Sequence, residues 1–207
     1  MKYVKHTTAI FLLITATSTL NARLVIEDFE GYPDTKALQA DVFSFGTAAQ
    51  AGKPSLALGL GENNSNAACF NLTWETGNNA NLCLLKLSQN VQNLSGYREI
   101  TVHIFLEDYS NADTSGEASA STLAKLAIQG KNGTIWQTRT VKSEKLPADS
   151  AYKLRFRLSA IDMERVEGAG TFPDTIGNIK NVRLRFENSK RSGFRQDAYI
   201  DSITAVQ

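Results

Sequence analysis

Three segments of the chain, 98–107, 152–158 and 182–187, place an apolar residue at every second position. In the first of them, REITVHIFLE, the residues on the apolar side are Val102, Ile104 and Leu106. Successive side chains of a strand point to opposite faces of a sheet, so this alternation is typical of a strand with one buried face. A chain with this pattern must fold into sheets that cover a core on one side only.

Shorter runs with similar composition extend the pattern over most of the chain. These runs are separated by the turn-forming residues Gly, Asn, Asp and Ser. Only Ser159–Glu167 has the spacing of a helix. We predict further strands at 24–29, 42–45, 55–60, 67–73, 82–87, 123–129, 134–141 and 198–206. Around ten short strands in one domain predict an all-β fold, a two-sheet antiparallel β-sandwich of the jelly-roll type.

The N-terminal segment has the layout of a secretory signal peptide. Lys2 and Lys5 form a basic start, an apolar run too short to span a bilayer follows at 9–14, and Ala22 offers a small residue for cleavage. We therefore expect residues 1–22 to be a signal peptide and 23–207 to be a single sandwich domain that is secreted or periplasmic. The sequence has no second apolar run of membrane length, so no membrane span is expected.

The chain has two cysteines, Cys69 and Cys83. They flank a predicted hairpin whose turn is GNNAN, and export would place them in an oxidising compartment. A cross-strand disulfide is therefore predicted, with two free thiols as the alternative.

The two ends of the predicted domain are rich in acidic residues. Asp201 interrupts the last strand, where an unpaired charge would be costly, and Asp28 and Glu30 belong to the first. First and last strands often lie side by side in a sandwich, so these carboxylates would meet and could bind a structural Ca²⁺, which takes oxygen ligands. The alternatives are a salt bridge from Asp201 to Arg23 or Arg195, or an aspartate that faces water.

Three short motifs resemble a known family. DFEGY at 28–32, the GKNG turn followed by IW at 130–136, and AYIDSI at 198–203 look like the galactose-binding-like jelly rolls of secreted carbohydrate-binding modules, in particular the family-11 type. The resemblance implies a jelly roll that binds a glycan and often holds a structural calcium. It maps the calcium ligands of such modules onto Glu30 and Asp201. No catalytic domain accompanies the predicted module in this sequence.

Candidate ligand-binding residues come from the aromatic residues and from the outward sides of the predicted strands. Aromatic rings stack on sugars, and arginine forks pair with carboxylates and sulfates. If the three alternating strands were neighbours in one sheet, their outward residues would form a patch suited to an acidic polysaccharide. Core packing of the tryptophans and simple solvation of the charges are the alternatives. The candidates are His103, Phe105, Arg155, Arg157, Arg183, Arg185, Trp74 and Trp136.

These observations predict a secreted, non-catalytic carbohydrate-binding protein. A jelly-roll polysaccharide lyase or glycosidase is one alternative, but no strand has the paired carboxylates that such glycosidases need. An extracellular protein-interaction or adhesive domain is another alternative, because fold alone does not define function. With 22 basic and 21 acidic residues the chain is nearly neutral, so no nucleic-acid partner is expected.

Overall fold

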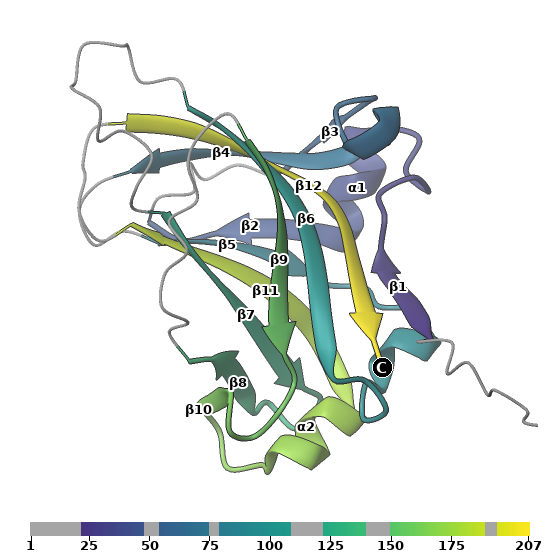
Figure 1. The fold of residues 1–207 in the computed structure, drawn as a ribbon, viewed down its shortest axis with the longest axis vertical. Helices are drawn as coiled ribbons and strands as arrows, with labels where there is room; N and C mark the ends of the chain where they lie inside the picture. The colour runs from purple at the N-terminus through teal and green to yellow at the C-terminus, as the bar shows by residue number, and fades with distance from the viewer. Residues whose placement is uncertain (1–21, 48–53, 75–78, 109–121, 140–149, 189–193) are drawn as a thin grey trace, which may run out of the picture.

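A computed structural model describes residues 22–47, 54–74, 79–108, 122–139, 150–188 and 194–207. The signal-peptide prediction for 1–22 falls almost wholly outside these residues. Two six-stranded sheets face each other, one in front of the other in Figure 1. All their pairings are antiparallel. The predicted all-β, two-sheet antiparallel sandwich is confirmed.

The first sheet, sheet A, has the strand order β3-β4-β12-β6-β9, with β1 also paired to β12. Its strands are β1 (Arg23–Glu27), β3 (Ser55–Ala57), β4 (Ala67–Trp74), β6 (Glu99–Asp108), β9 (Ser150–Arg157) and β12 (Phe194–Val206). Sheet B has the order β10-β8-β7-β11-β5-β2. Its strands are β2 (Val42–Phe45), β5 (Asn79–Leu84), β7 (Thr122–Gly130), β8 (Ile135–Thr138), β10 (Met163–Glu167) and β11 (Ile179–Asn188).

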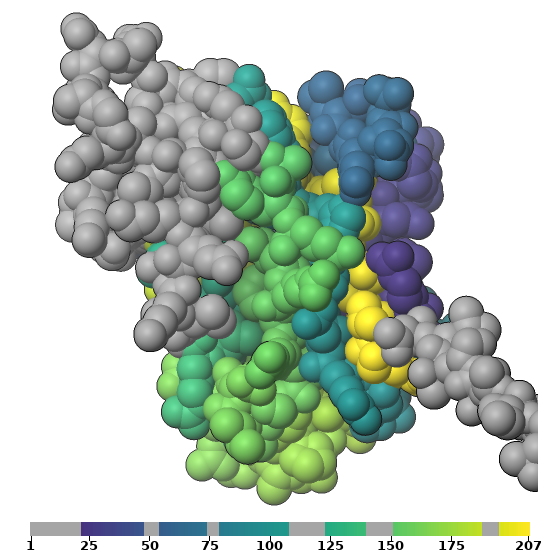
Figure 2. All heavy atoms as spheres, viewed as in Figure 1, coloured from purple at the N-terminus to yellow at the C-terminus, as the bar shows by residue number. Residues whose placement is uncertain are grey.

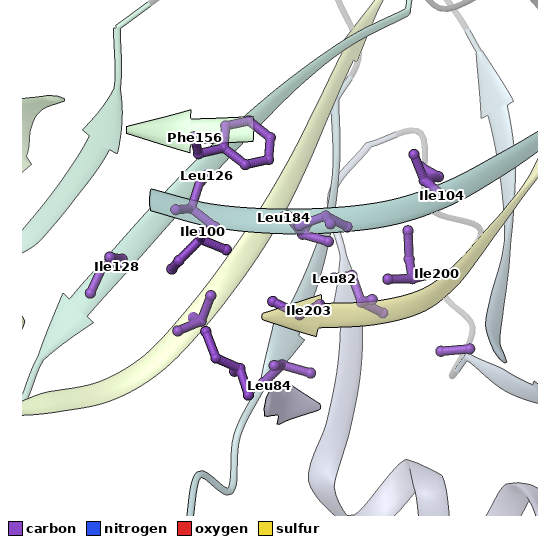
Figure 3. Close-up of a cluster of buried hydrophobic side chains, with 14 of the residues drawn as sticks. Leu82, Leu84, Ile100, Ile104, Leu126, Ile128, Phe156, Leu184, Ile200 and Ile203 are labelled. Atoms are coloured by element: carbon purple, nitrogen blue, oxygen red, sulfur yellow. The ribbon is translucent and has the colours of Figure 1, made fainter. Parts of the chain in front are cut away.

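The core lies between the two sheets. Ile100 and Ile104 of sheet A and Leu126 and Leu184 of sheet B are at most 2 % exposed and point into the same layer (Figure 3). The inward sides predicted for β6, β9 and β11 are confirmed. Each fully buried side chain of this size stabilises the fold by about 1.5–3 kcal/mol relative to an exposed one.

The helix predicted at Ser159–Glu167 is wrong. The Ser159 hydroxyl accepts hydrogen bonds from the amides of Ile161 and Asp162 and donates to the Asp162 carboxylate, which closes a turn. Residues Met163–Glu167 then pair with β8 as strand β10. Such short side-chain bonds to the backbone compete with helix formation.

The helices of the described segments are short, and the sequence reading missed them. They are α1 (Thr35–Asp41), α2 (Phe172–Gly177) and the 3₁₀ turns η1 (Glu62–Asn64) and η2 (Gln89–Gln92). The Asp34 carboxylate caps α1 by accepting from the amide of Ala37, and the Thr171 hydroxyl caps α2. No helix among the described residues has the length and apolar character to cross a membrane.

The predicted disulfide and its hairpin are both wrong. Cys69 on β4 belongs to sheet A and Cys83 on β5 to sheet B, and both are free thiols. Their neighbours in sequence point into the core, so each thiol is directed to the outer side of its own sheet. Burial is the main cause that raises the pKa of the Cys69 thiol to about 11, and burial also raises the pKa of the Cys83 thiol.

The first and last strands lie side by side, as predicted. β1 pairs with β12, and Arg23 lies opposite Val206. On the other side of β12, Ile200 faces Ile104 of β6 but Ser202 faces His103, so Asp201 is an extra residue without a partner in the ladder. This β-bulge turns the Asp201 side chain toward the outer face of sheet A.

Candidate functional site

The predicted ligand-binding residues do not form one patch. His103 and Phe105 on β6 and Arg155 and Arg157 on β9 belong to sheet A, where these two strands are neighbours. Arg183 and Arg185 lie on β11, which pairs with β5 and β7 in sheet B. The outer faces of the two sheets point away from each other, so the four arginines are divided between opposite sides of the sandwich.

Of the two predicted tryptophans, the structure describes the side chain of Trp136. Trp136 on β8 packs against the core and meets Phe172 edge-on, with ring centroids 5.3 Å apart. Its indole nitrogen Nε1 is buried without a hydrogen-bond partner among the described residues. Trp74 ends β4, and its side chain lies outside the described part of the chain. The packing alternative therefore holds for Trp136.

The outer face of sheet B carries a pair of exposed aromatic rings at its edge strand. Phe43 and Phe45 of β2 are 44 % and 37 % exposed. Their ring centroids are 6.1 Å apart and their planes differ by only 18°, so the two rings stack nearly parallel and form an exposed apolar surface. Ser44 between them points inward and is 4 % exposed.

A polar network stands next to these rings. The Arg183 guanidinium lies 5.7 Å from the centre of the Phe45 ring. Its Nε donates to the Asn181 side-chain oxygen at 3.0 Å, and its Nη2 donates to Gln129 Oε1 at 2.5 Å. The Asn181 amide also donates to Gln129 Oε1. This network holds the guanidinium in place beside the Phe45 ring, within reach of a ligand that covers both. We call Phe43, Phe45, Arg183, Asn181 and Gln129 the sheet B platform.

Three charged side chains further along this face pair with one another. Glu187 Oε2 lies 2.9 Å from the Lys125 amine, and its Oε1 lies 2.7 Å from Arg185 Nε. Arg183, in contrast, forms no ion pair within the described segments. Arg183 is therefore a cation beside the Phe45 ring that pairs with no carboxylate of the described residues.

The outer face of sheet A is hollowed. In Figure 2, atoms of β12 (yellow) and β6 (teal) lie between the segment around β3 (blue) and β9 (green). A cavity of about 480 Å³ opens there, lined by Leu60, Gly61, Glu62, His103, Ile104, Phe105, Ala151, Tyr152, Lys153, Tyr199 and Asp201. The Phe105 and Tyr199 rings pack at 5.9 Å with a 44° tilt, and the Tyr199 hydroxyl donates to Glu107. We call this space the sheet A cavity.

Three metal-capable side chains meet at the wall of the sheet A cavity. Glu62 comes from the β3–β4 loop, His103 from β6 and Asp201 from the bulge of β12. One ligand atom from each lies within 4.8 Å of the other two. His103 Nδ1 is 2.5 Å from Glu62 Oε2, and Asp201 Oδ1 is 2.5 Å from the Ser65 hydroxyl. Asp201 therefore faces Glu62, His103 and Ser65. Neither Arg23 nor Arg195 forms the alternative salt bridge to Asp201 among the described residues.

The acids near the N-terminus have partners of their own. Glu27 accepts from the amides of Asp28 and Phe29 and from the Tyr32 hydroxyl. Burial and this carboxylate raise the pKa of Tyr32. Asp28 accepts from the Glu30 amide.

Glu30 contacts the same loop as Asp201. Its Oε1 accepts from the Asn66 amide at 2.6 Å, one residue after Ser65. Within the described residues, however, the group of converging ligand atoms contains neither Asp28 nor Glu30. The predicted calcium ligands Glu30 and Asp201 therefore contact adjacent residues of one loop, but their oxygens do not converge on one point.

Comparison with solved structures identifies the fold, whereas comparison of sequences assigns the chain to no family. No family model matches the sequence, and no curated protein sequence matches it. The structure is similar to the family 11 carbohydrate-binding module of a cellulosomal cellulase of Clostridium thermocellum, with a TM-score of 0.53 and 14 % identity over 90 % of this chain and 95 % of that one.

Two further solved structures agree. The Clostridium thermocellum family 11 module in complex with a β-1,3-1,4-mixed-linked tetrasaccharide gives a TM-score of 0.53 at 14 % identity, covering 89 % of this chain and 95 % of that one. The solution structure of CtCBM11 gives 0.56 at 15 % identity over 91 % and 97 %. The chain thus has the jelly-roll fold of family 11 carbohydrate-binding modules.

Proposed function

We propose that the protein binds carbohydrate on the sheet B platform. The observation that carries this proposal is the exposed, nearly parallel pair of rings of Phe43 and Phe45 on the outer face of a jelly-roll sheet. Apolar C–H faces of pyranose rings stack on such surfaces. Structural similarity to carbohydrate-binding modules, one of them solved with a tetrasaccharide, supports the proposal.

The polar part of the platform would orient the sugar. Arg183, Asn181 and Gln129 bond to one another, so their side chains are ordered before a ligand arrives. An ordered site loses less side-chain entropy on binding than a mobile one. The sugar hydroxyls would then bond to the amide and guanidinium groups while the ring lies on Phe43 or Phe45.

We further propose that the preferred glycan is acidic. Arg183 is the one predicted arginine that stands beside the aromatic pair without an ion pair in the described segments, and a guanidinium pairs well with a carboxylate or sulfate. Of the four arginines predicted to bind an acidic glycan, the proposal thus keeps Arg183 alone. Arg185 shares the Glu187 carboxylate with Lys125 and is not expected to contribute much.

Binding without cleavage is the proposed mode. A retaining glycosidase needs two carboxyl groups about 5 Å apart and an inverting one needs a similar pair at a larger distance. Beside the platform stands Glu187, whose two oxygens contact Lys125 and Arg185. Both oxygens of this carboxylate are thus in contact with cations of the protein itself.

Export and calcium are further parts of the proposal. The basic and apolar N-terminal segment supports a secreted or periplasmic location. A structural Ca²⁺ near the chain termini would use oxygens of Glu30 and Asp201, which contact adjacent residues of the β3–β4 loop. Some movement of that loop would be needed to bring the two carboxylates to one ion.

Affinity electrophoresis of the mature protein in gels with neutral or acidic polysaccharides tests the binding site. We expect retention by an acidic polymer and clear loss of it in Phe43→Ala/Phe45→Ala. Phe105→Ala removes the same kind of ring from the opposite face and serves as the matched control. Unchanged retention of the double variant would overturn the platform, and new reducing or unsaturated sugar ends after incubation would overturn binding without cleavage.

A further inference from the structure

We propose that Glu62, His103 and Asp201 bind a divalent transition-metal ion of the zinc type at the wall of the sheet A cavity. Their ligand atoms already lie within 4.8 Å of one another. A tetrahedral zinc site with bonds of about 2.0–2.1 Å separates its ligand atoms by roughly 3.3 Å. Small side-chain movements therefore suffice to close the site.

Two of the three ligands are held in place by the fold. His103 sits in the middle of β6, and Asp201 is the bulge residue of the neighbouring strand β12. The Ser65 hydroxyl contacts Asp201 Oδ1 at 2.5 Å and fixes the direction of this carboxylate. Bonds of this kind orient metal ligands and increase the affinity of a site.

The third ligand belongs to a loop that is shaped to approach the other two. Asn63 and Asn64 both have a positive φ, near +60°, a conformation that asparagine tolerates better than most residues. A Cβ atom on Gly61 would come closer than 3.0 Å to both Ser65 and Asp201. The glycine thus lets the loop backbone lie directly against the site. The Glu62 side chain is 60 % exposed, so it can adjust when an ion binds.

The imidazole of His103 is incompletely satisfied without an ion. Nδ1 contacts Glu62, while Nε2 is buried and has no hydrogen-bond partner in the described segments. A buried polar atom without a partner costs stability. Either nitrogen could coordinate a metal after a small ring movement, with the other free to bond to a carboxylate, as is usual for histidine ligands.

The donor set favours a transition metal over calcium. Calcium takes oxygen ligands only, whereas an imidazole nitrogen together with carboxylates suits zinc and related ions. The group provides three protein ligands beside a cavity of about 480 Å³. Three ligands and an open side leave a fourth position for water. The ion would tie the β3–β4 loop to β6 and β12.

This proposal does not depend on the carbohydrate platform, which lies on the other sheet. The test is titration of metal-free mature protein with Co²⁺, followed by its visible absorption, and then competition with Zn²⁺. We expect one ion per chain and the strong absorption of a four-coordinate cobalt site. Glu62→Gln should weaken binding at least about tenfold, as loss of a ligand costs no less than loss of its supporting partners.

Two further variants complete the experiment. His103→Gln should lose the cobalt spectrum, while Glu99→Gln, which removes an acid on the same strand outside the group, should bind as the wild type does. Because Glu62 is exposed, its variant is expected to fold even if a change at His103 does not. Equal zinc affinity of Glu62→Gln and wild type, or no binding by the wild type, would overturn the proposal. So would calcium binding that is stronger than zinc binding and indifferent to His103→Gln.

Discussion

Gly61 lies so close to Asp201 that a Cβ atom on the glycine would come within 3.0 Å of the aspartate Oδ1. The loop after β3 is therefore packed directly on a carboxylate in the middle of β12. Positions 61 and 201 are far apart in sequence, and no periodic pattern relates them. Glu62, the next residue in the loop, contacts His103.

Gly61→Ala tests this contact. Its φ of −81° is open to alanine, and the atoms it would meet are the ends of the Ser65 and Asp201 side chains, which can turn away. We expect a change in unfolding free energy of at most about 1 kcal/mol, measured by urea denaturation without metal. Zinc affinity should fall clearly in the same variant, because Asp201 is displaced. Wild-type zinc affinity would show that the loop packing is irrelevant to the group.

The two cysteines should remain thiols even under oxidising conditions. They lie in different sheets with their side chains on opposite faces, so no disulfide can join them in the folded chain. The thiolate is the reactive form, and the raised pKa of Cys69, about 11, and of Cys83 leaves both neutral at pH 8. Ellman's reagent should react slowly with the folded protein and quickly with two thiols after denaturation. Fewer than two thiols in the denatured, unreduced protein would contradict this.

Binding of an acidic glycan should weaken with salt, and Arg183 should account for much of that dependence. We expect Arg183→Gln to reduce affinity by about tenfold to a hundredfold, since a charge-assisted hydrogen bond contributes about 1.5–3 kcal/mol, and to flatten the salt dependence. Isothermal titration at several salt concentrations measures both effects. Arg155→Gln, on sheet A, is the matched control and should bind as the wild type does. An unchanged salt slope in Arg183→Gln would exclude an acidic group at this position.

Calcium and zinc can be separated by thermal melting of metal-free protein. If calcium binds as the resemblance implies, a concentration 100 times its Kd adds about 2.7 kcal/mol, which raises Tm by roughly 5–10 °C for a domain of this size. Glu30→Gln should reduce that increase, and His103→Gln should not. The zinc response should show the reverse pattern. No rise in Tm with calcium would remove the predicted structural ion.

The inward and outward sides of the long strands could be predicted, but their assignment to sheets could not. Alternation in β6, β9 and β11 follows directly from the burial of one face, and the structure confirms it. Alternation does not say which strand is the neighbour, because that depends on contacts distant in sequence. The arginines of β9 and β11 therefore have the predicted orientation on opposite faces of the sandwich.

The candidate sites show the same division. His103 can be singled out because it is an outward polar residue of an alternating strand, and Asp201 because it interrupts an apolar strand. Glu62 lies in an exposed loop, where no periodic pattern marks it. Phe43 and Phe45 were missed because β2 reverses the usual rule: its polar Ser44 points inward and its aromatic residues point outward. Such a reversal leaves aromatic rings exposed where the sequence pattern predicts core.

The bulge at Asp201 changes the phase of strand β12. Ala198 and Ile200 point inward before it, and Ile203 and Ala205 point inward after it, so the inward positions pass from even to odd numbers. A chain shortened by Asp201 alone would keep one unbroken alternation and the same four core side chains. The extra residue therefore adds a carboxylate to the outer face while the positions on both sides of it keep their apolar residues in the core.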